Sequence, residues 1–118
     1  MNPFEALAQE PGPEQLLVLM LEGSQRFLSE LIAAVEAGHE AEQARALGRI
    51  LPILQALIEG LDPESGEMAT NLARLYEWWA FEIQAAAEAG DTARLHKVGA
   101  QIMDIRDSWA KQLTAKSA

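Results

Sequence analysis

The sequence predicts an all-α fold, an antiparallel up-down four-helix bundle with a short extra helix at its N-terminus. Apolar residues, mostly aliphatic ones and alanine, make up 49% of the 118 residues. That content suits one domain with a single core and favours helices over strands. Four long stretches carry apolar residues at steps of three and four, and short connections marked by Gly or Pro separate them. Four long helices with short connections are typical of an antiparallel bundle.

The first twelve residues form an arm of their own in this prediction. Pro3 suits the first position of a short helix, on which Phe4 and Leu7 make a small apolar face. Pro11, Gly12 and Pro13 follow as a stiff break. The arm either docks on the bundle or stays free, and the sequence leaves both states open. Residues 13–113 then form the bundle and residues 114–118 a flexible tail.

The first two long helices are predicted over Pro13–Ala37 and Glu40–Glu59. Gly23, inside the first, costs about 1 kcal/mol relative to alanine, so it indicates either a close helix–helix approach or a weak spot. Pro52 lies inside the second, and because the apolar periodicity continues through it, we expect a kink around Gly48 to Pro52 rather than a break. The residues expected to face inward are Leu16, Leu17, Met20, Leu21, Phe27, Leu28, Leu31, Ile32, Val35, Leu47, Ile50, Leu51, Leu54, Leu57 and Ile58.

The last two helices are predicted over Glu67–Ala89 and from Asp91 to Leu113. Gly90 can adopt the left-handed conformation that closes a helix, and Asp91 is a natural N-cap for the next one. The residues expected to face inward are Met68, Leu72, Leu75, Trp79, Ile83 and Ala86, followed by Leu95, Val98, Ile102, Ile105, Trp109 and Leu113.

A second apolar ridge follows from the pair Trp78 and Trp79, because neighbouring residues point about 100° apart on a helix. If Trp79 faces the core, Trp78 lines up with Arg74, Phe81 and Ala85 instead. Either neighbouring helices cover this ridge as part of a wide stripe, or the aromatic side chains bind a partner.

Charge and composition exclude several function classes. The formal net charge is −9, and the nine Lys and Arg residues are scattered, so the basic patch that nucleic acids or anionic membranes require is absent from the sequence. No apolar run approaches the roughly 20 residues that span a bilayer. The N-terminus lacks the pattern of a secretory signal, so we expect a cytoplasmic protein. The chain contains no cysteine, and redox chemistry therefore says nothing of the compartment.

No catalytic or metal-binding constellation stands out. Glu36 and His39 form a Glu-x-x-His, but Gly38 interrupts the helix, and the other histidine, His96, has Ala93 three residues before it. A di-iron bundle needs two such motifs. The serines have no convincing histidine partner, and the glycines indicate helix ends rather than a phosphate-binding loop. We therefore expect no enzyme, no cofactor and no metal.

Three segments carry a family resemblance. LDPESGEMATNLARLY at Leu61–Tyr76 resembles the signature of the flagellar secretion chaperones called FliS. IMDIRDSW at Ile102–Trp109 is similar to that family's closing helix, where a Leu-Arg-x-x-Trp pattern is usual. PGPEQLLVLMLEGSQRFL at Pro11–Leu28 resembles its first long helix, with Glu22 where an aspartate is common. The three pieces occur in the right order with the right spacing.

The resemblance implies an export chaperone. It would bind the disordered C-terminal segment of flagellin in the cytoplasm, keep flagellin from polymerising, and help deliver it to the flagellar type III export apparatus. The family's N-terminal tyrosine, which can occupy the client groove, is absent here, and Phe4 is the one aromatic residue of the arm. From helical phase and the resemblance, the candidate partner-binding residues are Met20, Leu21, Asn71, Tyr76, Trp78 and Phe81.

Two further expectations accompany this reading. Tyr76 is expected to bury its ring and leave its hydroxyl at the rim of the site, with a hydrogen-bond partner of its own. The alternative function is a self-associating helical bundle without a flagellin client, in which the ridge of Trp78 and Phe81 is a dimer interface. The sequence leaves monomer and homodimer open.

Overall fold

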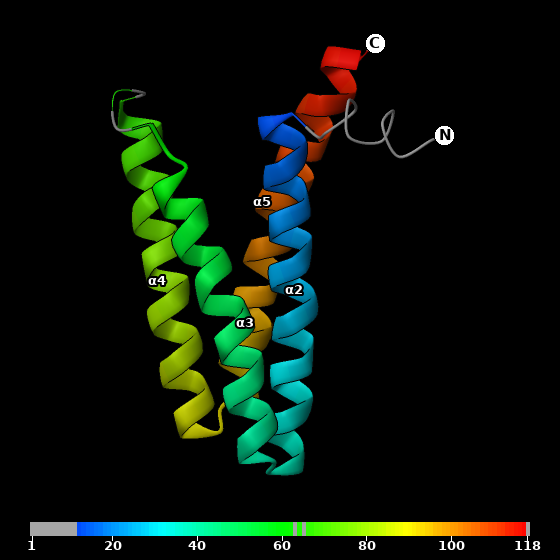
Figure 1. The fold of residues 1–118 in the computed structure, drawn as a ribbon, viewed down its shortest axis with the longest axis vertical. Coiled ribbons are helices and arrows are strands. Elements are labelled where there is room, and N and C mark those ends of the chain that lie inside the picture. The colour runs from blue at the N-terminus through cyan, green and yellow to red at the C-terminus, as the bar shows by residue number, and fades with distance from the viewer. Residues whose placement is uncertain (1–11, 63, 65, 118) are drawn as a thin grey trace, which may run out of the picture.

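The predicted four-helix bundle is present in the structure, a computed structural model that describes residues 12–62, 64 and 66–117. Its helices are α2 (Pro13–Ala37), α3 (Glu40–Glu59), α4 (Glu67–Ala89) and α5 (Thr92–Ser117). Successive helices run in opposite directions (Figure 1). α2 packs on α3 and α5, and α4 packs on the same two, whereas α2 and α4 barely touch across the diagonal. The short N-terminal helix that we predicted lies outside the described residues.

The ends of the helices follow from their punctuation residues. Gly38 and Gly90 take positive φ angles of 71° and 68° and close α2 and α4, in the left-handed region that favours glycine. The Asp91 carboxylate accepts a hydrogen bond of 3.2 Å from the backbone N–H of Arg94, which confirms Asp91 as the N-cap of α5.

Two expectations about helix continuity had different outcomes. α3 runs unbroken over Pro52, as the continuing apolar periodicity predicted. The flexible tail expected from residue 114 is instead helical, because α5 extends to Ser117. No glycine or proline follows Leu113, so nothing in the sequence stops this helix earlier.

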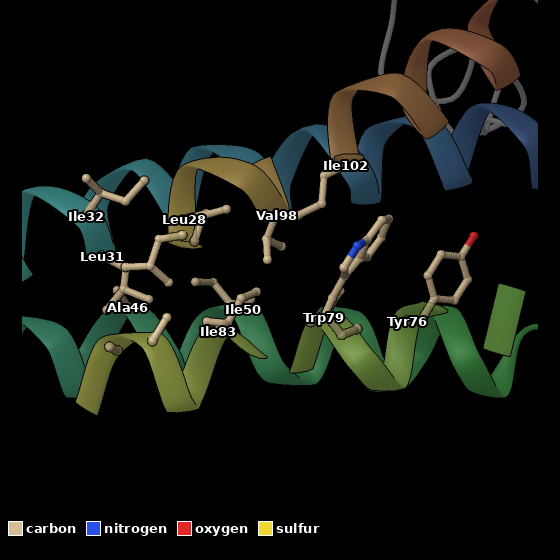
Figure 2. Packing of buried hydrophobic residues seen from close by; sticks show 14 of the residues in the cluster. Leu28, Leu31, Ile32, Ala46, Ile50, Tyr76, Trp79, Ile83, Val98 and Ile102 are labelled. Atoms are coloured by element: carbon tan, nitrogen blue, oxygen red, sulfur yellow. The ribbon is translucent and has the colours of Figure 1, made fainter. Parts of the chain in front are cut away.

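The core lies along the middle of the bundle and ends in two aromatic rings. Trp79 and Tyr76 point from α4 toward α2 and α5, at one end of a run of aliphatic side chains (Figure 2). The side chains buried most completely are those of Leu21, Leu28, Leu31, Ile50, Leu54, Tyr76, Trp79, Ile83, Leu95, Val98 and Ile102.

Met68 departs from the predicted inward stripe, because 65% of it is exposed. It has the helical phase of the buried Trp79, eleven residues or about three turns further on. Toward the end at which α5 finishes, however, α3 and α4 diverge from α2 and α5 (Figure 1). The side chain of Met68 therefore points inward at a level where no described helix packs against it.

Polar contacts between helices are few and specific. The indole N–H of Trp79 donates to Oε1 of Gln101 at 2.9 Å, which satisfies the one polar atom of this buried ring. Arg94 of α5 binds both carboxylate oxygens of Glu82 on α4. Arg106 of α5 donates to Glu22 of α2 at 3.0 Å. Each contact joins α5 to a neighbouring helix.

The glycine at a close helix–helix approach is Gly99 rather than Gly23. A Cβ atom at Gly99 would lie 3.0 Å from Oε1 of Gln25 and 3.4 Å from Cδ2 of Leu28. A Cβ atom at Gly23 would meet only Cδ1 of Ile53 at 3.7 Å, an ordinary contact. The close approach inferred from Gly23 is therefore wrong, because the neighbouring helix leaves room for a methyl group there.

Alanine substitutions should affect stability differently at these two glycines. Gly23→Ala should raise the free energy of unfolding by about 0.5–1 kcal/mol, because alanine is the better helix former and the space is free. Gly99→Ala should gain less or lose stability, because Gln25 must move and Leu28 is held in the core. Gly48→Ala is the control, since nothing lies within 4 Å of its Cβ position. Chemical denaturation measures all three, and an equal gain for Gly99→Ala and Gly48→Ala would contradict the packing described.

Candidate functional site: an apolar groove at the open end of the bundle

An open groove of about 580 Å³ lies at the end of the bundle where α2 and α4 begin and α3 ends. Such a volume is within the range of small ligand sites in proteins. Its two charged lining residues, Glu14 and Asp62, are both acidic, and most of the others are apolar. The lining residues are Pro13, Glu14, Leu16, Leu17, Met20, Ala56, Leu57, Gly60, Leu61, Asp62, Met68, Ala69, Leu72, Tyr76 and Trp109.

The groove exists because apolar stripes continue past the level at which the helices pack closely. Leu16 at the start of α2 is 48% exposed, although the sequence phase places it among inward residues. Met68 at the start of α4 is exposed in the same way, and Trp109 from α5 is partly buried against the core. Apolar side chains gathered in a concave site mark a binding surface more often than scattered ones do.

Tyr76 marks the boundary between the groove and the core. Its ring is fully buried and packs on the ring of Trp79, with centroids 5.3 Å apart and a tilt of 42°. The hydroxyl oxygen is also buried and has no hydrogen-bond partner. The burial of the ring was predicted correctly, whereas the prediction that the hydroxyl lies at the rim with a hydrogen-bond partner of its own was wrong. Burial raises the pKa of this phenol, because the phenolate would lose its hydration.

The six candidate residues fall into three environments. Met20 and Tyr76 line the groove. Leu21 is fully buried in the core. The other three candidates are exposed on α4 and do not line the groove: Asn71, Trp78 and Phe81.

We call the stripe of Arg74, Trp78, Phe81 and Ala85 the outer ridge; its first three residues are exposed, and Ala85 is half-buried. Trp78 is 44% exposed and Phe81 is 69% exposed. Of the two readings of this stripe, burial under neighbouring helices is therefore wrong for the described part of the chain. By helical phase the outer ridge points to the side of α4 opposite the groove.

Sequence reasoning placed Leu16, Leu17, Met68, Leu72 and Trp109 in the core rather than in a groove. All five carry the inward phase, and the periodicity gave no sign that the helices diverge around them. For the four residues on α2 and α4 the available signal was their position near helix starts that follow Pro- or Gly-containing connections. Trp109 on α5 carried no such signal.

Metal and membrane sites receive no support from the described residues. Among them, no group of three or more His, Cys, Asp and Glu residues could hold a metal ion. His39 is exposed, and its Nδ1 lies 3.2 Å from the carboxylate of Glu42 rather than beside Glu36. None of the described helices combines the length and the hydropathy needed to cross a membrane.

The titration of Tyr76 tests the environment at the inner end of the groove. It is the one tyrosine of the chain, so the ultraviolet absorbance of tyrosinate reports on it alone. The midpoint should lie near 10 in the denatured chain and above that value in the folded one. Since the unfolded chain releases the proton first, the free energy of unfolding should fall as pH rises above about 10.

Tyr76→Phe should abolish both the absorbance change and this part of the pH dependence. Circular dichroism over the same range shows whether the chain is still folded. A native midpoint at the ordinary value would mean that the phenol is solvated, which would contradict its burial between the core and the groove.

The three segments that carry the family resemblance converge on this groove. Apart from Ala56, Leu57 and Gly60, every lining residue belongs to Pro11–Leu28, Leu61–Tyr76 or Ile102–Trp109. The ion pair between Glu22 and Arg106 joins the first of these segments to the last.

Comparisons with known proteins agree with this pattern. A family model described as "Flagellar protein FliS" matches residues 5–116. The flagellar secretion chaperone FliSB of Pseudomonas aeruginosa is 31% identical over 107 residues, which cover 90% of this chain and 85% of that protein. The flagellar secretion chaperone FliS of Salmonella typhimurium is 28% identical over 116 residues, which cover 97% of this chain and 85% of that protein. The matches extend over nearly the whole chain, and the chain belongs to the FliS family of flagellar secretion chaperones.

Proposed function

We propose that this chain is an export chaperone for flagellin and that the groove binds the C-terminal segment of flagellin. It acts in the cytoplasm, keeps flagellin from polymerising early, and assists its delivery to the flagellar type III export apparatus. One observation carries the proposal: the segments that resemble the chaperone family meet around one apolar groove. Proteins that bind the same client need a similar binding surface, and these segments supply one.

The physical mechanism is coupled folding and binding. A disordered segment gives up conformational freedom when it binds, so its affinity depends on a few well-placed apolar anchors. An amphipathic helix of the client lays its apolar face into the groove, against Leu16, Met20 and Met68. Methionine side chains adapt their shape to a partner, which suits a groove that receives a folding segment.

Charge and position limit what the groove accepts. Because Glu14 and Asp62 are its charged lining residues, it favours a client segment flanked by neutral or basic residues rather than acidic ones. Met20 and Tyr76 from the candidate set belong to this site. Leu21 supports it from within the core and does not touch the client directly.

A self-associating bundle without a client is the second candidate function. The exposed outer ridge favours it, because two large aromatic side chains in one patch are typical of an interface. Titration with flagellin separates the two candidates, since a bundle without a client binds no flagellin.

Groove variants should weaken binding of the C-terminal flagellin segment from the same organism in calorimetric titration. We expect one-to-one binding in the micromolar range or tighter, with a negative heat-capacity change from apolar burial. Leu16→Gln and Met68→Gln should each lower affinity about tenfold, because each removes an apolar anchor and leaves a polar group to desolvate. Both positions are largely exposed, so the fold should be retained.

Leu19→Gln is the matched control. Leu19 lies on the same helix as Leu16 and is similarly exposed, at 54%, but does not line the groove. Its substitution should leave affinity within about twofold of the parent. Equal effects of Leu16→Gln and Leu19→Gln would place the client elsewhere, and absence of binding to the folded parent would reject the flagellin client altogether.

A further inference from the structure

Three buried polar atoms among the described residues have no hydrogen-bond partner, and one of them belongs to a residue of the groove. They are Oε1 of Gln25, Nε of Arg106 and the hydroxyl oxygen of Tyr76. Of these three residues, Tyr76 alone lines the groove, and it alone is fully buried. Figure 2 shows its ring reaching from α4 toward α2 and α5, with the hydroxyl at the far end. A buried polar group without a partner is rare in native proteins and calls for an explanation.

The other two atoms are explained by their surroundings. Arg106 donates from its two terminal nitrogens to Glu22 and Asp107, so two carboxylates already hold its guanidinium. The carboxamide of Gln25 lies against Gly99 at the close contact between α2 and α5, so packing fixes its position. The Tyr76 hydroxyl has neither kind of restraint.

Packing does not account for the Tyr76 hydroxyl. A phenylalanine would fill the same space beside Trp79 without burying a polar oxygen. Replacing an unsatisfied polar group by an apolar one of the same shape is nearly neutral or stabilising. The core therefore gains nothing from the hydroxyl, and its benefit has to come from a group that binds to the chain. Because burial raises the pKa of this phenol, it keeps its proton for donation.

We propose that the Tyr76 hydroxyl determines specificity at the inner end of the groove, where it donates a hydrogen bond to a neutral amide carbonyl of the bound client segment. The carbonyl belongs either to an Asn or Gln side chain or to the main chain near the end of a client helix, where backbone acceptors are free. A carboxylate fits poorly, because apolar surroundings penalise its charge and Glu14 and Asp62 repel it. This inference rests on the proposed function of the groove.

The burial of the hydroxyl sets a condition on the client. The atom is closed off from solvent in the free chain, so a client reaches it only when a lining side chain turns aside. Met20 suits this role, because it lines the groove from α2, toward which Tyr76 points, and its unbranched side chain adapts readily. A segment that rests on the rim leaves the hydroxyl unpaired. Sites built around a hydrogen bond reject ligands that lack the matching group, which apolar contact alone does only weakly.

Tyr76→Phe tests the proposal in calorimetric titration with the C-terminal flagellin segment. Affinity should fall about tenfold, because the client carbonyl is then buried without a donor. The midpoint of thermal unfolding without client should equal or exceed that of the parent, since the substitution removes an unsatisfied group. Ser24→Ala is the matched control. It also removes a fully buried hydroxyl, but one that donates to the main-chain oxygen of Met20 at 3.0 Å and lies outside the groove lining, so the affinity should not change.

A local readout separates a hydrogen bond from a general change in packing. Tyr76 is the one tyrosine of the chain, so a ¹³C label at tyrosine Cζ reports on this hydroxyl alone, and its resonance should shift when the client saturates the parent. Single replacements of each Asn and Gln of the client segment by Leu then identify the acceptor. A replacement that weakens binding to the parent but not to Tyr76→Phe identifies a side-chain carboxamide. If no replacement does so while Tyr76→Phe still loses affinity, the acceptor is a main-chain carbonyl.

The remaining outcomes overturn the inference, and they are distinguishable from a failure of the proposed function. Equal affinity of the parent and Tyr76→Phe, or a Cζ resonance that does not move at saturation, rejects the hydrogen bond but leaves the groove as the client site. A lower unfolding midpoint in Tyr76→Phe would mean that the hydroxyl already has a partner in the free chain. A folded parent that binds no flagellin segment rejects both the inference and the proposed function.

Discussion

The buried pair of Tyr76 and Trp79 is the contact on which this structure depends. Trp79 fills the bundle between α4 and α5, and its indole N–H is satisfied by Gln101 at 2.9 Å. Tyr76 packs on it and lines the groove, and toward that end of the bundle α3 and α4 diverge from α2 and α5 (Figure 1). A bundle that stayed closed past this point would bury Leu16 and Met68. The groove is therefore a consequence of where the aromatic pair ends the core, and its walls are the continuation of the core stripes.

Most of the architecture could be predicted from the sequence, because local chemistry encodes it. Gly38, Gly90 and Asp91 end and start helices through their own conformational and hydrogen-bonding preferences, so the bounds of α2, α3 and α4 were correct. The groove could not be predicted in this way. Met68 and Trp79 have the same helical phase, and phase gives a direction but not whether another helix lies in that direction. For the same reason, the sequence suggested a close helix–helix approach at Gly23, whereas the structure has it at Gly99.

α4 serves two surfaces, which explains why the candidate residues separated. Its inner face carries Met68, Leu72 and Tyr76 into the groove, and its outer face carries Trp78 and Phe81 to solvent. The sequence showed both apolar stripes but not which one a client would meet. Family membership adds weight to the inner face, because the segments that resemble FliS proteins meet there. The outer face lies outside that groove, and its exposed Trp78 and Phe81 are not among the lining residues.

The most direct test of the central claim uses the methionines as local probes. Met20 and Met68 line the groove, whereas Met103 lies beside Gly99 in a smaller pocket between α2 and α5. Methyl resonances of the three should be recorded with and without the C-terminal segment of flagellin. If the segment binds in the groove, the Met20 and Met68 signals shift or broaden as it is added, and the Met103 signal stays in place. Shifts confined to Met103, or saturating binding that leaves Met20 and Met68 unchanged, would contradict the account.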